Sequence, residues 1–265
     1  MITLTAGTVS SADGTTIGYE SVGRGPVVVL VDGAMCYRAF GPMRPLASLL
    51  AEHFTVYAYD RRGRGESGDT PPYAVAREVE DVQAVIGAAG GQAYLYGISS
   101  GAALAMAAAA AGSGITKLAL YEPPYVAEIE GDARAKDYTE HLHELLAQGR
   151  RGDAVEWFMT YVGVPGPVIA GMRAQPTWRV FETIAPTLAY DNQALTGGRV
   201  PHDVASAVRV PTLVLAGGDS PQNLQQAARV AADALASATV HTLPCQTHDV
   251  SPAALAPALV EFYSA

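Results

Sequence analysis

The sequence predicts an α/β fold with a mostly parallel sheet that is covered by helices on both faces. Short apolar runs alternate with segments of helical periodicity along most of the chain, which is the pattern of strands joined by crossover helices. The chain has 265 residues, of which 49% are hydrophobic. This length and composition suit one large domain and are too apolar for a disordered protein.

The first half of the chain supplies most of the predicted strands. Residues 3–22 are expected to form two strands that meet at a hairpin signal, Ala12-Asp13-Gly14. The run Val-Val-Val-Leu-Val at 27–31 has no polar position, as expected of a strand buried on both faces. Together with five later strands, these three predict a sheet of eight strands. The other strands are predicted at 54–59, 94–96, 115–121, 211–216 and 239–243, and helices at 42–51, 75–88, 101–111, 224–235 and 252–262.

The character of the sequence changes between residues 125 and 205. Strand-like runs stop there, and both tryptophans, Trp157 and Trp178, lie in this stretch. We interpret residues 125–205 as a helical insertion after the sixth strand, and residues 1–124 with 206–265 as one core domain. Within the insertion, helices are predicted at about 132–148, 154–162 and 178–188.

One serine lies at a turn between a predicted strand and an alanine-rich helix. Gly97 and Gly101 flank Ser99 in the G-x-S-x-G spacing. Such a turn strains the serine backbone, and side chains two residues away on either side would clash with the strand and the helix. The serine hydroxyl would then lie above the sheet edge at the start of a helix, where an oxyanion is stabilised.

Several other polar residues come directly after predicted strands. The carboxyl ends of parallel strands meet at one edge of the sheet, and this edge is where such folds bind their ligands. One serine, one late histidine and several acids are therefore expected to converge there. These residues are Asp32, Asp60, Ser99, Glu122, Asp219 and His248.

Together these features resemble the α/β-hydrolase family over nearly the whole chain. Besides the turn at Ser99, the run from Asp60 to Ser67 is similar to the family's D-x-R-G-x-G-x-S turn. His248 comes last, in the family's order of serine, acid and histidine, and family members carry a lid where the 125–205 insertion lies. The resemblance implies the fold, whereas fold alone does not determine chemistry.

The resemblance also implies roles for individual residues. Ser99 would be the nucleophile and His248 its base, because a serine hydroxyl is barely ionised at neutral pH. The backbone N–H groups of Ala34 and Ser100 would form the oxyanion hole. Many members have His-Gly after the third strand, whereas this chain has Asp32-Gly33. Asp32 would bring a carboxyl group close to the oxyanion hole and influence substrate preference.

The acid that orients His248 has two candidates in the sequence. Asp219 follows the seventh strand, where most of the family keeps its acid, but it lies one residue before the family's G-x-x-D position, which is Ser220 here. Glu122 follows the sixth strand, and a minority of the family, including some haloalkane dehalogenases, resembles this arrangement. Glu122 is favoured over Asp219, since a shift of one residue can turn a side chain to the other face.

The predicted function is a cofactor-independent serine hydrolase that forms an acyl-enzyme on Ser99. The expected substrate is a small or medium ester, thioester or lactone with an apolar portion. Two alternatives stay open: a lyase or rearrangement enzyme that uses the same residues, and a ligand receptor with negligible turnover. Substrate contacts are expected from Asp32, Met35, Trp157 and Trp178.

Composition argues against other classes of function. The formal net charge is −9 with no basic run, which disfavours nucleic acid and anionic membranes as partners. No Walker A pattern and no cysteine–histidine metal spacing occur, so no cofactor or metal is expected. Two cysteines, Cys36 and Cys245, and a start without a visible secretory signal suggest the cytoplasm. A homodimer is left open.

Overall fold

The computed structural model describes residues 4–112 and 114–265. It confirms the predicted fold class, with eight strands in one sheet. Residue 3, the predicted start of the first strand, lies outside the described residues. The strands are β1 (Thr5–Ser10), β2 (Thr16–Gly23), β3 (Val27–Val31), β4 (Thr55–Tyr59), β5 (Ala93–Ile98), β6 (Ile115–Tyr121), β7 (Thr212–Gly217) and β8 (Ala238–Leu243).

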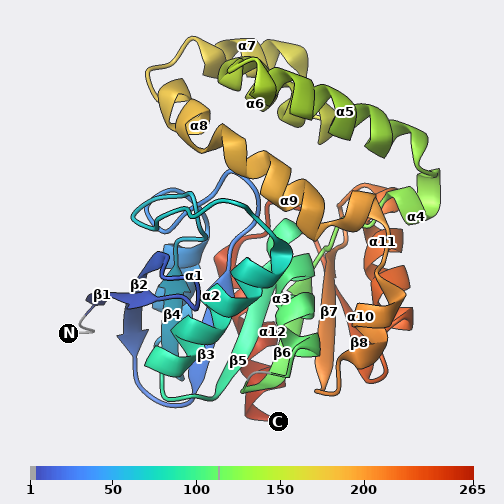
Figure 1. The fold of residues 1–265 in the computed structure, drawn as a ribbon. Coiled ribbons are helices and arrows are strands. Elements are labelled where there is room, and N and C mark those ends of the chain that lie inside the picture. The colour runs from blue at the N-terminus through green and yellow to red at the C-terminus, as the bar shows by residue number, and fades with distance from the viewer. Residues whose placement is uncertain (1–3, 113) are drawn as a thin grey trace.

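The sheet is mostly parallel, and its strand order is β1-β2-β4-β3-β5-β6-β7-β8. Only the β1–β2 and β2–β4 pairs are antiparallel. The other five pairs are parallel, so the strands from β3 to β8 share one carboxyl edge. This edge is at the top of the sheet in Figure 1.

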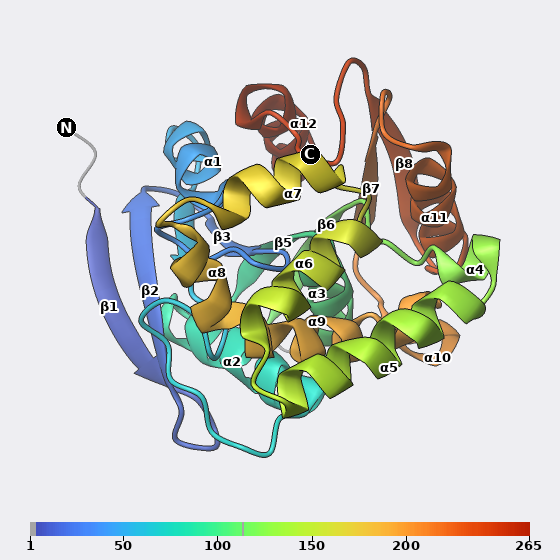
Figure 2. The same cartoon turned by 90° about the horizontal axis from the view of Figure 1, so that it is seen from above.

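Helices cover both faces of the sheet because the strands are apolar on both sides. In β3, Val28 and Leu30 belong to one apolar core, whereas Val29 and Val31 belong to the other. The alternation follows from the two-residue period of a strand. Figure 2 shows α1 (Met43–Leu50) and α12 (Pro252–Ser264) together on one side. The opposite core includes residues of α2 (Val75–Ala88), α3 (Ser100–Ala110), α10 (His202–Ala207) and α11 (Gln222–Asp233).

Between β6 and β7 the chain forms a run of helices that we call the helical segment, residues 127–194. Its upper helices lie above the carboxyl edge of the sheet (Figure 1). They share an apolar cluster that also contains Met35 from the loop after β3. The predicted insertion extended to residue 205, but α10 packs against α3 in the core. The segment comprises α4 (Ala127–Glu130), α5 (Ala133–Ala147), α6 (Arg151–Tyr161), α7 (Gly166–Arg173), α8 (Trp178–Ile184) and α9 (Leu188–Ala194).

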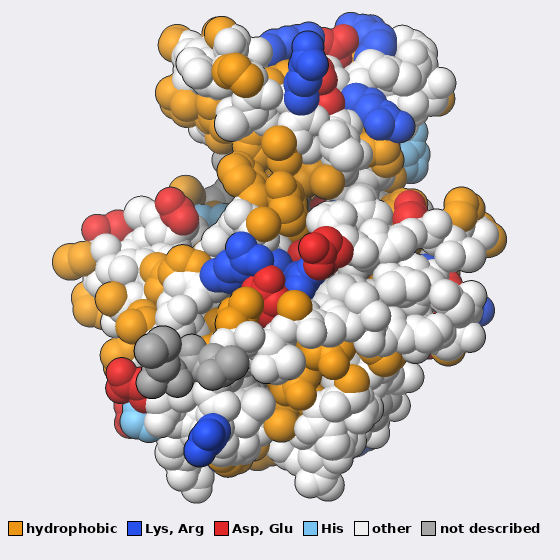
Figure 3. Space-filling view, turned by 90° about the vertical axis from the view of Figure 1, so that its left-hand side faces the viewer, with side chains coloured by type: hydrophobic (Ala, Val, Ile, Leu, Met, Phe, Trp, Pro, Cys, Tyr) orange, Lys and Arg blue, Asp and Glu red, His pale blue; other side chains and the backbone are white. Residues whose placement is uncertain are grey.

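The molecule narrows between the helical segment and the core, and hydrophobic side chains gather at this waist (Figure 3). One contact between the two parts joins the ring of Phe40, in the loop after β3, to that of Phe181 in α8. Their centroids are 5.2 Å apart in an edge-on arrangement. In the part of the chain that the structure describes, no helix is long and apolar enough to cross a membrane.

Candidate active site

Ser99 lies at the sharp turn between β5 and α3, with φ 56° and ψ −127°. A Cβ atom at Gly97 would lie 2.4 Å from the carbonyl oxygen of Gly101. A Cβ atom at Gly101 would lie 2.4 Å from the carbonyl oxygen of Asp32. Both distances are impossible for a side chain, so the turn that presents Ser99 requires glycine at both positions.

A histidine and a buried carboxylate are paired at the same edge of the sheet. His248 Nδ1 lies 2.8 Å from Glu122 Oε2, and Glu122 Oε1 accepts a hydrogen bond of 2.8 Å from the Gly217 N–H. Burial raises the pKa of Glu122, but the hydrogen bonds from His248 and Gly217 outweigh it and hold the pKa below its usual value. An ionised carboxylate can only accept, so Nδ1 carries a proton and Nε2 of the neutral ring is free to act as a base.

Asp219, the other candidate for this carboxylate, is not paired with His248. Its N–H donates to the carbonyl of Gln246 at 2.8 Å, and the residue is exposed in the turn that follows β7. Its side chain has no hydrogen bond to any residue that the structure describes. The family's usual acid position holds the buried Ser220 in this chain, Asp219 before it is exposed, and the glutamate after β6 contacts the histidine instead.

Tyr121, the last residue of β6, connects the loops that carry Ser99, Glu122 and His248. Its carbonyl accepts a hydrogen bond of 2.9 Å from the Ser99 N–H. Its hydroxyl donates to the carbonyl of Thr247 at 2.6 Å, one residue before His248. Sequence reasoning missed this residue, although a buried tyrosine hydroxyl at the end of a strand needs a partner. Among the described residues, Ser99 and His248 form no direct hydrogen bond with each other.

The loop after β3 approaches the turn at Ser99 closely. A Cβ atom at Gly33 would lie 3.1 Å from Ser99 Cβ and 3.8 Å from its Oγ. The next N–H group along the chain belongs to Ala34, and the N–H of Ser100 follows Ser99. Within the described residues, neither N–H group has a hydrogen-bond acceptor. Both N–H groups that the sequence assigned to an oxyanion hole are therefore available as donors. They belong to the residues that follow Gly33 and Ser99, which approach each other closely.

Asp32 is a buried carboxyl group beside this loop. Its Oδ1 accepts a hydrogen bond of 2.8 Å from the Gly33 N–H, whereas its Oδ2 has no partner among the described residues. Burial raises the pKa of Asp32 to about 7, despite the hydrogen bond from Gly33 and the nearby charges of Arg64 and Arg61, which lower it. The carboxyl group therefore exchanges a proton close to neutral pH.

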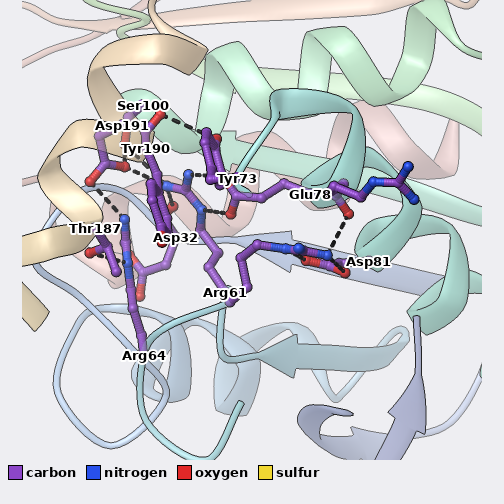
Figure 4. Close-up of polar contacts among 12 residues, drawn as sticks. Asp32, Arg61, Arg64, Tyr73, Glu78, Asp81, Ser100, Thr187, Tyr190 and Asp191 are labelled. Carbon is purple, nitrogen blue, oxygen red and sulfur yellow. Dashed lines mark hydrogen bonds and ion pairs between the residues drawn. The ribbon is translucent and has the colours of Figure 1, made fainter. Parts of the chain in front are cut away.

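The Asp60–Ser67 run supplies three arginines whose side chains are buried. Arg61 pairs with Glu78, and Arg62 pairs with Asp81. Arg64 pairs with Asp191 of the helical segment. Figure 4 shows Arg61 and Arg64 meeting at Asp191, whereas the pair at Asp81 lies apart from them. Buried charges need partners of opposite sign. Asp191 lies three residues from both Leu188 and Ala194, on the buried face of α9, and this spacing is the sequence signal that could have identified it as a buried carboxylate.

The apolar residues predicted to contact substrate belong to one cluster. Met35 and Trp178 are buried in it, and Trp157 packs against it. Trp157 Nε1 donates to the carbonyl of Tyr138 at 3.2 Å, and Trp178 Nε1 has no partner among the described residues. Among the residues that the structure describes, no group of three or more histidine, cysteine, aspartate or glutamate side chains could hold a metal ion.

Comparison with known proteins identifies the family of the chain. A family model described as the alpha/beta hydrolase family matches residues 27–260, which is most of the chain. The chain therefore belongs to the alpha/beta hydrolase family. This membership supports a hydrolase as the class of enzyme.

Solved structures show the same relationship. An alpha/beta hydrolase from Sphaerobacter thermophilus DSM 20745 is 50% identical, with a TM-score of 0.88 over 97% of this chain and 100% of that one. A thermophilic esterase from Thermogutta terrifontis is 20% identical, with a TM-score of 0.71 over 98% of each chain. An enol-lactonase from Burkholderia xenovorans LB400 is 23% identical, with a TM-score of 0.67 over 97% of this chain and 100% of that one. The last two show similarity of fold alone.

Proposed function

We propose that the protein is a serine hydrolase in which Ser99, His248 and Glu122 form a catalytic triad. The observation that carries the proposal is the 2.8 Å pair between His248 and the buried Glu122, at the sheet edge that also presents Ser99 in its strained turn. This pairing leaves His248 Nε2 free to take the hydroxyl proton. The contact between the serine and histidine side chains is often long in an unliganded site and tightens around substrate.

The reaction uses side chains and backbone groups of the protein together with one water molecule. Ser99 Oγ attacks the acyl carbon while His248 takes its proton, and the N–H groups of Ala34 and Ser100 stabilise the resulting oxyanion. His248 then donates the proton to the departing alkoxide or thiolate, which leaves an acyl-enzyme. A water molecule then gives a proton to His248 and attacks the acyl carbon. The bond between the acyl carbon and Ser99 Oγ breaks as His248 returns that proton to Oγ, which releases the carboxylic acid and restores the site.

The proposed substrate is a small or medium ester, thioester or lactone with an apolar portion. The apolar cluster that contains Met35, Trp157 and Trp178 would supply an apolar wall above the site. The carboxyl group of Asp32 would influence which polar groups of a substrate are accepted close to the oxyanion hole. If these tryptophans contact substrate, Trp157→Ala and Trp178→Ala alter the chain-length preference among p-nitrophenyl esters. An unchanged preference with lower stability would assign both residues to packing.

Covalent labelling tests the nucleophile. A fluorophosphonate should add one label per chain, and Ser99→Ala should abolish both labelling and turnover of p-nitrophenyl esters. Labelling that persists in Ser99→Ala would refute the assignment. A wild-type protein that binds esters without turnover would indicate a ligand receptor, and products formed without net hydrolysis would indicate a lyase. The cytoplasmic location and the homodimer stay predictions.

A further inference from the structure

Asp191 of α9 is a buried carboxylate that contacts the start of α3. It is 3% exposed, and its Oδ1 accepts a hydrogen bond of 2.7 Å from Ser100 Oγ. The same oxygen accepts from Arg61 Nη1 at 2.7 Å, and Oδ2 accepts from Arg64 Nη2 at 2.7 Å. Figure 4 shows Asp191 between Ser100 and the arginine side chains. One residue of the helical segment thus holds the side chain of Ser100, the residue that directly follows Ser99.

Arg64 extends this contact to the loop after β3. Its Nη1 donates to the carbonyl of Gly33 at 2.6 Å, and its Nε donates to Thr187 Oγ1 at 3.0 Å. The Gly33 carbonyl and the Ala34 N–H belong to the same peptide group. Because a trans peptide is planar, its C=O and N–H point in opposite directions. A guanidinium that fixes the carbonyl therefore also fixes the direction of the Ala34 N–H.

The charge of Asp191 is what keeps this arrangement together. Burial raises the pKa of Asp191, but the positive charges of Arg64 and Arg61 outweigh it and hold the pKa below its usual value. The carboxylate is therefore ionised at neutral pH, and charge-assisted hydrogen bonds of this kind are stronger than neutral ones. Without that charge, Arg64 would lose its carboxylate partner, and its guanidinium would support the Gly33–Ala34 peptide less firmly.

We propose that Asp191 is a positioning residue for the oxyanion hole, acting on Ser100 directly and on the Ala34 peptide through Arg64. The proposal rests on the function proposed above. An oxyanion donor acts mainly in the transition state, so loss of its alignment lowers kcat and leaves KM nearly unchanged. Loss of one such donor costs about 10²–10³-fold, and misalignment should cost about 10–100-fold.

Two variants and a matched control test the proposal. Asp191→Asn removes the charge, and Ser100→Ala removes the hydroxyl that Asp191 holds while keeping the Ser100 N–H. Asp81→Asn is the control, because Asp81 is equally buried and pairs with Arg62 at 2.7 Å without contacting Ser100. Each protein is assayed for kcat and KM with a p-nitrophenyl ester, for the rate of fluorophosphonate labelling and for thermal unfolding.

The expected result is a fall in kcat of about 10–100-fold in Asp191→Asn, with KM within about threefold and slower labelling. Ser100→Ala should lose kcat in the same way, and the double variant should lose less than the product of the two effects because both act through one contact. Asp81→Asn should unfold at a lower temperature with kcat preserved.

Three results would overturn the positioning role. These are an unchanged kcat in Ser100→Ala, an unchanged kcat in a folded Asp191→Asn, or an equal loss in Asp81→Asn. If Asp191→Asn does not fold, Ser100→Ala decides alone. A wild-type protein that neither labels nor turns over esters would refute the proposed function itself, which is a different outcome.

Discussion

Tyr121→Phe should impair turnover even though Tyr121 does not touch the reacting atoms. The substitution removes one hydroxyl and keeps the ring. The lost contact is the 2.6 Å hydrogen bond to the carbonyl of Thr247, which anchors the loop that carries His248. Because Thr247 is exposed, water can replace the lost partner of its carbonyl, and the cost is that of one ordinary hydrogen bond, about 0.5–1.5 kcal/mol. For a chain of this size, each kcal/mol corresponds to roughly 2–4 °C in Tm.

The catalytic effect follows from the position of Thr247 directly before His248. A loop that has lost this anchor holds the imidazole less firmly against Glu122, so we expect kcat to fall about tenfold with KM nearly unchanged. Steady-state hydrolysis of a p-nitrophenyl ester measures both constants, and thermal unfolding measures the stability. The expected labelling by a fluorophosphonate is slower by a similar factor.

Two other buried tyrosines provide controls. Tyr263 donates to the carbonyl of Leu95 at 2.8 Å, far along the chain from His248. Tyr263→Phe should therefore cost a similar amount of stability and leave kcat unchanged. Tyr125 has a hydroxyl without a partner among the described residues, and Tyr125→Phe should change neither quantity appreciably. A Tyr121→Phe protein with the stability of Tyr263→Phe and the kcat of the wild type would refute the reasoning.

Four further substitutions have defined expectations. Glu122→Gln should lower kcat by up to about 10⁴-fold, because an amide can stabilise the wrong tautomer of His248, whereas Asp219→Asn should retain most activity. Asp32 has its pKa raised to about 7 by burial, so between about pH 4 and 7 the native state keeps a proton that the unfolded state has released. The unfolding free energy of the wild type should therefore fall relative to that of Asp32→Asn by about 1.4 kcal/mol per pH unit in that window, measured by denaturant titration. Gly101→Ala should prevent folding or expression, because its Cβ would lie 2.4 Å from the Asp32 carbonyl oxygen.

Each of these expectations has an opposite outcome. Loss of activity in Asp219→Asn but not in Glu122→Gln, with both proteins folded, would transfer the acid role to Asp219. Parallel unfolding curves for the wild type and Asp32→Asn from pH 4 to 7 would mean that Asp32 titrates normally. A stable, active Gly101→Ala protein would show that the turn at Ser99 can relax.

The sequence predicted the central strands well because runs such as β3 and β7 are mostly apolar and buried on both faces. It favoured Glu122 over Asp219 from the offset of one residue after β7; Glu122 contacts His248 and Asp219 is exposed, and the catalytic role of Glu122 stays a prediction. Short helices such as α7 and α9 were missed, since eight or fewer residues give little periodicity. The contact of Asp191 with Ser100 spans 91 residues, and no local pattern encodes such a pairing.

The buried arginines also determine which residues carry the net charge of the protein. Arg61, Arg62 and Arg64 face Glu78, Asp81 and Asp191 inside the fold, and these six charges cancel. The formal net charge of −9 is therefore carried by the remaining residues. A field of this sign repels anions over roughly 10 Å at 0.1 M salt. Added salt should accordingly speed the association of an anionic ester and leave that of a neutral ester unchanged.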